Sequence, residues 1–185
     1  KNENRNKIII ASTEHKCVIE AARAASRLFG FVVDIVPVDR YGFVDLNWLE
    51  ESLDDNVALV SIMSVNNEIG TIQDLSAISK IVRSAGALFH SDFAQAPASL
   101  SVSSWLQCID IASFSAHKIY GPKGVGAIWV ERSVQDRLGP IIYGGGQQNF
   151  MRSGTVPVSL VVGFAEAAII QETVRESEGA YLRSL

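Results

Sequence analysis

The sequence predicts an α/β domain of three layers (α/β/α), in which helices cover both faces of a mostly parallel sheet with one antiparallel strand. Short apolar runs alternate with stretches of helical periodicity along the chain. Several runs are apolar almost throughout, which is typical of strands covered on both faces. The chain has 185 residues, 48% of them apolar and 19% charged, so it can bury one core and is not disordered.

The order of the runs gives the expected elements. The strands are expected at residues 8–11, 31–36, 57–63, 87–90, 109–114 and 125–130. Helices are expected at 18–28, 46–53, 75–82 and 158–170. Asp45 and Asp74 are placed to cap the second and third helices, Gly30 to end the first, and Pro157 to open the last. Only a few residues separate the last two strands, which is too short for a helical crossover, so we expect that pair to be antiparallel.

Charge and cysteine content exclude several classes of protein. Sixteen basic and 20 acidic residues give a net charge of −4 without a basic block, which disfavours nucleic-acid binding and electrostatic membrane docking. No apolar run reaches the roughly 18 residues of a membrane span. Cys17 and Cys108 make neither a disulfide framework nor a metal-ligand spacing, and we expect both to be buried. A reducing, cytoplasmic compartment fits best. The polar start without Met suggests a piece of a longer chain.

Polar side chains follow four of the expected strands, in segments 12–16, 64–70, 91–95 and 115–118. Ligands in such folds bind beyond the carboxyl ends of the strands. Taken singly, each residue has an ordinary explanation: Asp92 as a helix cap, for example, or Lys118 as a surface lysine. Together they fit one chemistry. A lysine in a partly desolvated pocket forms imines, and a buried aspartate keeps a pyridine nitrogen protonated, so the pattern predicts a pyridoxal 5'-phosphate (PLP) site.

The same segments resemble a known family. Five motifs carry the resemblance: Thr13-Glu14-His15-Lys16, Val65-Asn66-Asn67-Glu68-Ile69-Gly70, Asp92-Phe93-Ala94-Gln95, Ser113-Phe114-Ser115-Ala116-His117-Lys118-Ile119-Tyr120-Gly121-Pro122-Lys123-Gly124 and Met151-Arg152-Ser153-Gly154-Thr155. They resemble the cysteine desulfurases, which belong to the class V aminotransferase branch of the fold-type-I PLP enzymes. The resemblance extends over residues 8–170 in the expected order. It implies the large domain of a PLP-dependent transferase.

Three residues receive catalytic or ring-binding roles from the resemblance. Lys118 would be the Schiff-base lysine, and Asp92 would contact the pyridine nitrogen. His15 would stack on the cofactor ring and assist proton transfer.

Five further residues would hold the cofactor's periphery. Gln95 would bind the ring hydroxyl, and Asn66 would lie between that oxygen and the substrate carboxylate. Ser115 and His117 would bind the phosphate. Thr155 would reach the phosphate of a neighbouring subunit, which implies a homodimer with shared sites.

The chain also departs from the family pattern. Ala116 replaces a common glycine, and residues 147–149 stand where a histidine commonly follows the glycines. The family's upstream Gly-Ala-Thr segment, its substrate-binding arginine and its nucleophilic cysteine are not in the chain. We therefore expect residues 1–185 to be a single PLP-binding portion of the large domain, without the N-terminal segment and the C-terminal small domain.

The implied activity converts L-cysteine to L-alanine. The sulfur would pass, as a persulfide on an enzyme cysteine, to an acceptor protein for iron–sulfur cluster assembly or tRNA thiolation. The portion seen here is expected to be inactive alone. Two alternatives stay open: another class V enzyme, such as a selenocysteine lyase or an aminotransferase, and a PLP-free fragment that dimerises or binds a partner. A nucleophilic loop cysteine would distinguish a cysteine desulfurase from the other class V enzymes. A yellow solution that borohydride bleaches would show bound PLP and exclude the PLP-free fragment.

Overall fold

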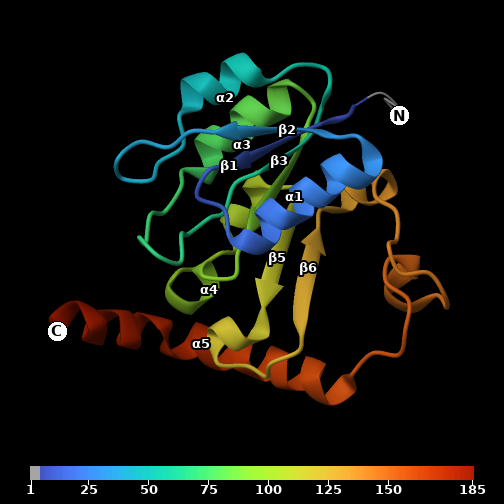
Figure 1. Ribbon diagram of the computed structural model, residues 1–185. Helices are drawn as coiled ribbons and strands as arrows, with labels where there is room; N and C mark the ends of the chain where they lie inside the picture. The colour runs from blue at the N-terminus through green and yellow to red at the C-terminus, as the bar shows by residue number, and fades with distance from the viewer. Residues whose placement is uncertain (1–4) are drawn as a thin grey trace.

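The computed structural model describes residues 5–185 and contains one six-stranded sheet (Figure 1). Its strands are β1 (Lys7–Ala11), β2 (Val32–Val36), β3 (Val57–Ser61), β4 (Leu88–Asp92), β5 (Ile111–Ser115) and β6 (Gly126–Val130). They lie in the order β2-β1-β3-β4-β5-β6. Neighbours among β1 to β5 are parallel, and β6 is antiparallel to β5. The expected sheet and its antiparallel pair are confirmed.

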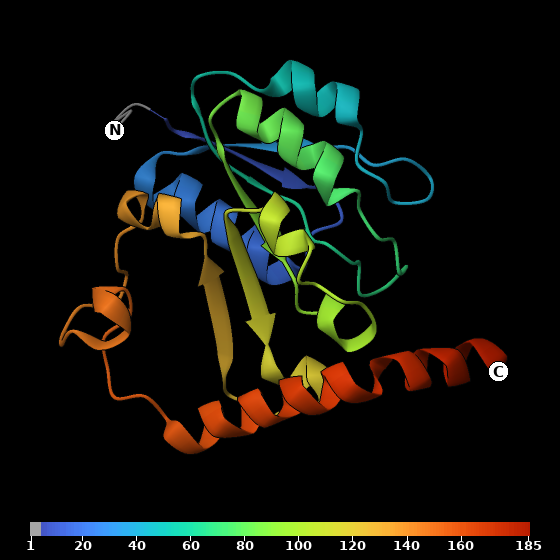
Figure 2. The same cartoon turned by 180° about the vertical axis from the view of Figure 1, so that it is seen from behind.

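Helices cover both faces of the sheet, as the sequence predicts. The α-helices are α1 (Lys16–Phe29), α2 (Leu46–Ser52), α3 (Leu75–Ser84), α4 (Ala96–Ser99) and α5 (Val158–Ser184). Helices α2 and α3 lie on one face and α1 on the other (Figures 1 and 2). Strand β1 shows why: Ile9 belongs to the core with α2 and α3, whereas Ile8 and Ile10 pack under α1.

Local capping explains where the helices begin and end. The Asp45 carboxylate accepts hydrogen bonds from the first turn of α2, and Asp74 does so for α3. Gly30 ends α1 in the left-handed conformation, which glycine adopts without strain. Pro157 precedes α5. All four expected boundary residues are confirmed.

Short 3₁₀ helices complete the chain: η1 (Trp105–Cys108), η2 (Ala116–Ile119), η3 (Arg132–Arg137) and η4 (Gln147–Phe150). Helix α5 continues to Ser184, well beyond the expected end at residue 170. It crosses the edge of the sheet at which β5 ends (Figure 2) and contacts α4 and η2. No helix within residues 5–185 has the length and apolar character that a membrane crossing requires.

The expected burial of the cysteines is wrong. Cys17 is exposed and Cys108 is only partly buried. The apolar stripe that α1 turns toward the sheet consists of Val18, Ile19, Ala22 and Ala25, and Cys17 precedes it. The first turn of α1 therefore carries the Cys17 side chain off the packed face.

Candidate active site

Four polar segments meet at one edge of the sheet, because β1, β3, β4 and β5 are parallel neighbours. Hydrogen bonds join the segments directly. The Asn66 side-chain amide donates to the Thr13 carbonyl at 2.9 Å, and the Ser64 backbone N–H donates to the Asp92 carbonyl at 3.1 Å. The structure thus brings together the loops that carry seven of the eight residues singled out from the sequence.

Asp92 ends β4 with its side chain buried to 8% exposure. One carboxylate oxygen, Oδ1, accepts a hydrogen bond from the Ala94 N–H at 2.8 Å. The backbone carbonyl of Asp92 is fixed separately, since the Ser64 hydroxyl donates to it at 2.9 Å. Helix α4 starts later, with Gln95 at its N-cap, so Asp92 caps no helix. The helix-cap explanation of Asp92 is wrong, and a buried carboxylate is left at the strand end.

His15 is the N-cap of α1 and is exposed. Its ring nitrogen Nδ1 accepts a hydrogen bond from the Cys17 N–H at 3.2 Å and lies 3.0 Å from the Cys17 Sγ. Desolvation raises the pKa of the Cys17 thiol, and the negative charge of Asp92 acts in the same direction. Cys17 is therefore a protonated thiol beside His15.

Glu14 is a buried acid that the sequence reasoning did not single out. Its Oε1 accepts a hydrogen bond from the Met63 N–H, and its Oε2 is buried without a partner among the described residues. Burial raises the pKa of Glu14 to about 8, and the Asp92 charge adds to the rise. The available signal was its position in a polar run directly after a buried strand.

Asn66 is buried, and protein groups occupy both ends of its amide. Its Oδ1 accepts from the Glu68 and Ile69 N–H groups at 2.9 and 3.0 Å, and its Nδ2 donates to Thr13. Asn66 therefore stabilises the turn that follows β3. The same bonds fix the loop after β3 against the loop after β1.

The loop after β5 carries Ser115, His117 and Lys118. Ser115 ends the strand and is half-buried, whereas His117 and Lys118 lie in η2 and are exposed. Lys118 forms no ion pair within residues 5–185. The partly desolvated pocket expected around this lysine is not formed by the described residues.

The two remaining residues lie at the ends of other elements. Gln95 is half-buried and makes no side-chain cap hydrogen bond to α4. Thr155 is exposed between η4 and α5. No hydrogen bond of the described chain joins Thr155 to the other seven residues.

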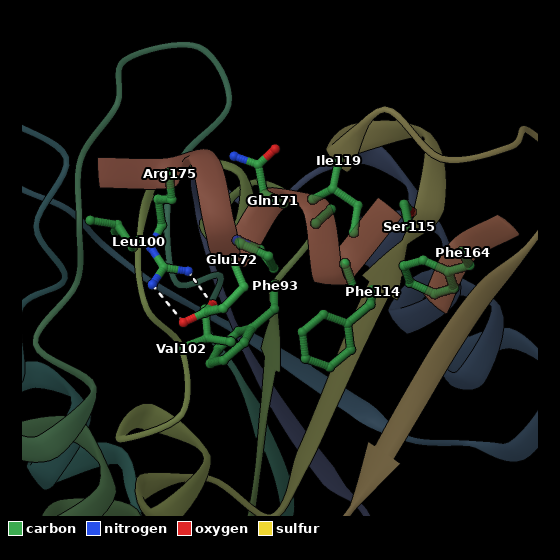
Figure 3. A pocket seen from close by; sticks show the side chains of 13 residues that line it. Phe93, Leu100, Val102, Phe114, Ser115, Ile119, Phe164, Gln171, Glu172 and Arg175 are labelled. Atoms are coloured by element: carbon green, nitrogen blue, oxygen red, sulfur yellow. Dashed lines mark hydrogen bonds and ion pairs between the residues drawn. The ribbon is translucent and has the colours of Figure 1, made fainter. Parts of the chain in front are cut away.

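A separate cavity of about 190 Å³ lies between α4, β5 and α5 (Figure 3). Its lining is mainly apolar, with Phe93, Phe114 and Phe164 among its side chains. Glu172 and Arg175 of α5 form an ion pair beside it. Ser115 is the only one of the eight predicted residues that lines this cavity. The cavity therefore lies beside the four polar segments at the strand ends, and most of the predicted site residues do not line it.

Comparison with known proteins decides the family. Residues 2–178 match the sequence model of the family described as aminotransferase class-V. The chain belongs to the class V aminotransferases. This membership confirms the resemblance drawn from the five motifs, and with it the assignment to a family of PLP-dependent enzymes.

Individual class V relatives are cysteine desulfurases. The chain is 43% identical over 181 residues to cysteine desulfurase IscS of Rickettsia felis, covering 98% of this chain and 44% of that protein. It is 44% identical over 183 residues to the mitochondrial cysteine desulfurase of Saccharomyces cerevisiae, covering 99% of this chain and 37% of that protein. The chain thus spans less than half the length of these curated relatives.

Solved structures agree with the fold. A NifS-like protein superposes with a TM-score of 0.89 at 40% identity, covering 95% of this chain and 48% of the other. A structure described as SspA in complex with cysteine gives a TM-score of 0.80 at 36% identity, covering 90% and 48%. The three-layer fold is therefore that of solved members of this group.

Proposed function

We propose that this chain is the PLP-binding portion of the large domain of a cysteine desulfurase, which converts L-cysteine to L-alanine and passes the sulfur as a persulfide to an acceptor protein. One observation carries the proposal. Asp92, His15 and the Ser115–Lys118 loop converge at the carboxyl ends of adjacent parallel strands, the usual place for ligands in this architecture. The relatives named cysteine desulfurase, and the one solved with cysteine, support the choice of substrate.

The donor set fits PLP. A buried carboxylate suits a protonated pyridine nitrogen, and Asp92 uses only one oxygen in a hydrogen bond to the protein. Hydroxyl and imidazole groups at the end of β5, from Ser115 and His117, suit a phosphate. The exposed amine of Lys118 follows on the same loop and suits an aldehyde.

Each residue then has a defined task. PLP, when bound, supplies an electron sink for the bonds at the substrate's α-carbon. Asp92 would hold the ring nitrogen, Gln95 would hold the ring hydroxyl, and His15 would stack on the ring. Lys118 would hold the aldehyde, and its amine could serve as a base toward the substrate.

The remaining tasks concern the substrate and the second subunit. Asn66 would act beside the substrate carboxylate by fixing the loop after β3 against the loop after β1, since protein groups occupy both ends of its amide. Thr155 completes the phosphate site of a partner subunit in a homodimer. We assign the nucleophilic thiolate that takes up the sulfur to a cysteine other than Cys17, because desolvation and the Asp92 charge raise the pKa of the Cys17 thiol and disfavour its thiolate.

The proposal is tested by locating the amine that binds PLP. The intact protein is incubated with PLP, reduced with borohydride and digested for peptide mapping. We expect the pyridoxyl group on the peptide that contains Lys118, and loss of labelling in Lys118→Ala. Lys16 and Lys123 flank the same site, so Lys16→Ala and Lys123→Ala are matched controls that keep the label. A label that follows Lys16 or Lys123 would overturn the site assignment, and no label at all would overturn the PLP function.

A further inference from the structure

The ring of His15 is held by a single neighbouring residue. Cys17 approaches the Nδ1 nitrogen twice, with its backbone N–H at 3.2 Å and with its Sγ at 3.0 Å. Both side chains are exposed at the start of α1, so the contact is not imposed by close packing in the core. It is a local arrangement of the Glu14-His15-Lys16-Cys17 turn.

The backbone contact decides where the ring proton lies. A backbone N–H can only donate, so Nδ1 must be the acceptor and carries no proton. In a neutral imidazole the proton is then on Nε2. The thiol, which faces the same lone pair, must in turn donate its S–H to Nδ1. This agrees with the surroundings of Cys17, since desolvation and the negative charge of Asp92 raise the pKa of the thiol.

We propose that Cys17 is a positioning residue that fixes His15 in the tautomer with the proton on Nε2. The outward nitrogen of His15 is then a hydrogen-bond donor. To act as a base through Nε2, the ring would have to move its proton to Nδ1 and lose both hydrogen bonds from Cys17. The inference deepens the proposed function, because it says in which form His15 meets the cofactor and the substrate.

The tautomer can be measured without PLP. The intact protein is labelled with ¹⁵N-histidine, and two-bond correlations between the ring nitrogens and the carbon-bound protons are recorded; the signals of His15 are those absent from His15→Gln. We expect an unprotonated Nδ1 and a protonated Nε2 in the wild type and in Cys17→Ser, whose hydroxyl can also donate. Cys17→Ala removes the thiol and leaves only the backbone N–H as a donor to Nδ1. Loss of one hydrogen bond of ordinary strength should increase the population of the minor tautomer, with the proton on Nδ1, about five-fold. Cys108→Ala is the matched control and leaves the His15 signals unchanged.

Two results would overturn the inference. One is a protonated Nδ1 in the wild type, and the other is a His15 tautomer ratio in Cys17→Ala equal to that in Cys17→Ser. Circular dichroism of each variant shows that it is folded before its spectrum is interpreted. The tautomer measurement needs no cofactor, so the two proposals can fail separately. A proton on Nε2 together with absent PLP labelling would refute only the proposed function. A proton on Nδ1 together with PLP labelling at Lys118 would refute only this inference.

Discussion

Two buried titratable side chains, Glu14 and His90, lie near Asp92 at the ends of β1 and β4, and burial shifts the pKa of each. Burial raises the pKa of Glu14 to about 8 and lowers that of His90 to about 4. His90 is held between strands by Ser61 at 2.8 Å and Ser113 at 3.2 Å. Both Glu14 and His90 are uncharged at neutral pH, so Glu14 is not a second anion that competes with Asp92 for a cationic ring nitrogen.

We predict that Asp92→Asn leaves a protein that binds PLP and is coloured but turns over slowly. An amide cannot stabilise the protonated ring nitrogen, and an ion pair shielded from water of this kind is worth a few kcal/mol, so the rate falls by about two to four orders of magnitude. The measurement is alanine formation from cysteine by the intact protein. Asp55, exposed in the turn before β3, offers the matched control Asp55→Asn, which keeps the rate. Near-normal turnover of Asp92→Asn would show that the carboxylate has only a structural role.

We predict that Glu14→Gln removes a pH dependence of stability. The folded protein keeps a proton on Glu14 up to a pH of about 8, whereas the unfolded chain loses it near 4.5, so stability falls as the pH rises between these values. Glutamine presents the same shape without ionising. Between pH 6.5 and 8 the wild type is expected to lose about 2 kcal/mol in the free energy of unfolding that the variant does not lose.

The useful range for this measurement is set by His90. Its lowered pKa gives an opposite slope, because between pH 4 and 6.5 the unfolded chain binds the extra proton. The free energies of urea unfolding of wild type and Glu14→Gln are therefore compared between pH 6.5 and 8, the range in which Glu14 titrates and His90 does not. Glu51→Gln, at an exposed position of α2, is the control that keeps the wild-type slope. Equal slopes in wild type and Glu14→Gln would refute the buried-acid account.

At the scale of elements, local signals in the sequence were sufficient for the strands and for the four longer helices, but not for the short helix α4. Apolar runs locate the strands, and Asp45 and Asp74 mark helix starts because capping depends on neighbours in the chain. The end of α5 could not be read this way. The apolar run stops at residue 170, but polar residues continue the helix to Ser184, and neither a glycine cap nor a proline directly follows residue 170.

For the candidate site, too, the sequence predicts some features and not others. Its residues could be found from motifs, since seven of the eight lie at or directly after the end of a strand and Thr155 belongs to the Met151–Thr155 motif. Their states could not, because exposure of Cys17, burial of Glu14 and the open surroundings of Lys118 depend on how distant segments pack. The sequence analysis expected Cys17 to be buried, but the packed stripe of α1 consists of Val18, Ile19, Ala22 and Ala25 and leaves Cys17 exposed. A helix rotated by a fraction of a turn accounts for that error.

The pairing of β5 with β6 depends on a glycine. Gly126 lies opposite Ser115, and a Cβ at Gly126 would come within 2.5 Å of the Phe114 carbonyl oxygen. We predict that Gly126→Ala separates the two strands at this point and lowers the free energy of unfolding by about 1–3 kcal/mol. Urea unfolding measures the loss. Gly139→Ala, at a position where nothing lies within 4 Å of the added carbon, is the matched control. An equal loss in both variants would mean that strand separation is not the cause.

At the scale of the whole molecule, large apolar side chains are exposed along two consecutive segments. In the segment before α5, Ile141 is 92% and Tyr143 82% exposed, and Phe150 follows at 72%. On α5 itself, Val158 and Val162 are 67% and 61% exposed. Exposed apolar groups concentrated in this way mark a surface that another molecule or segment covers. Thr155 lies between the two segments, and its proposed target is the phosphate site of a partner subunit.

We predict that this surface is the interface of a homodimer and that Val162→Glu breaks it. A carboxylate at an apolar interface loses its hydration without gaining a partner, which opposes association. Sedimentation of the intact protein at micromolar concentration is expected to give a dimer for the wild type and monomers for the variant. Because Thr155 would leave the partner's site with the interface, the affinity for PLP should fall together with dimerisation. Leu28→Glu, at a position of α1 that is 65% exposed and outside this surface, is the control that stays dimeric. A wild-type protein that is active as a monomer, or a Val162→Glu variant that stays dimeric, would assign this surface to another role.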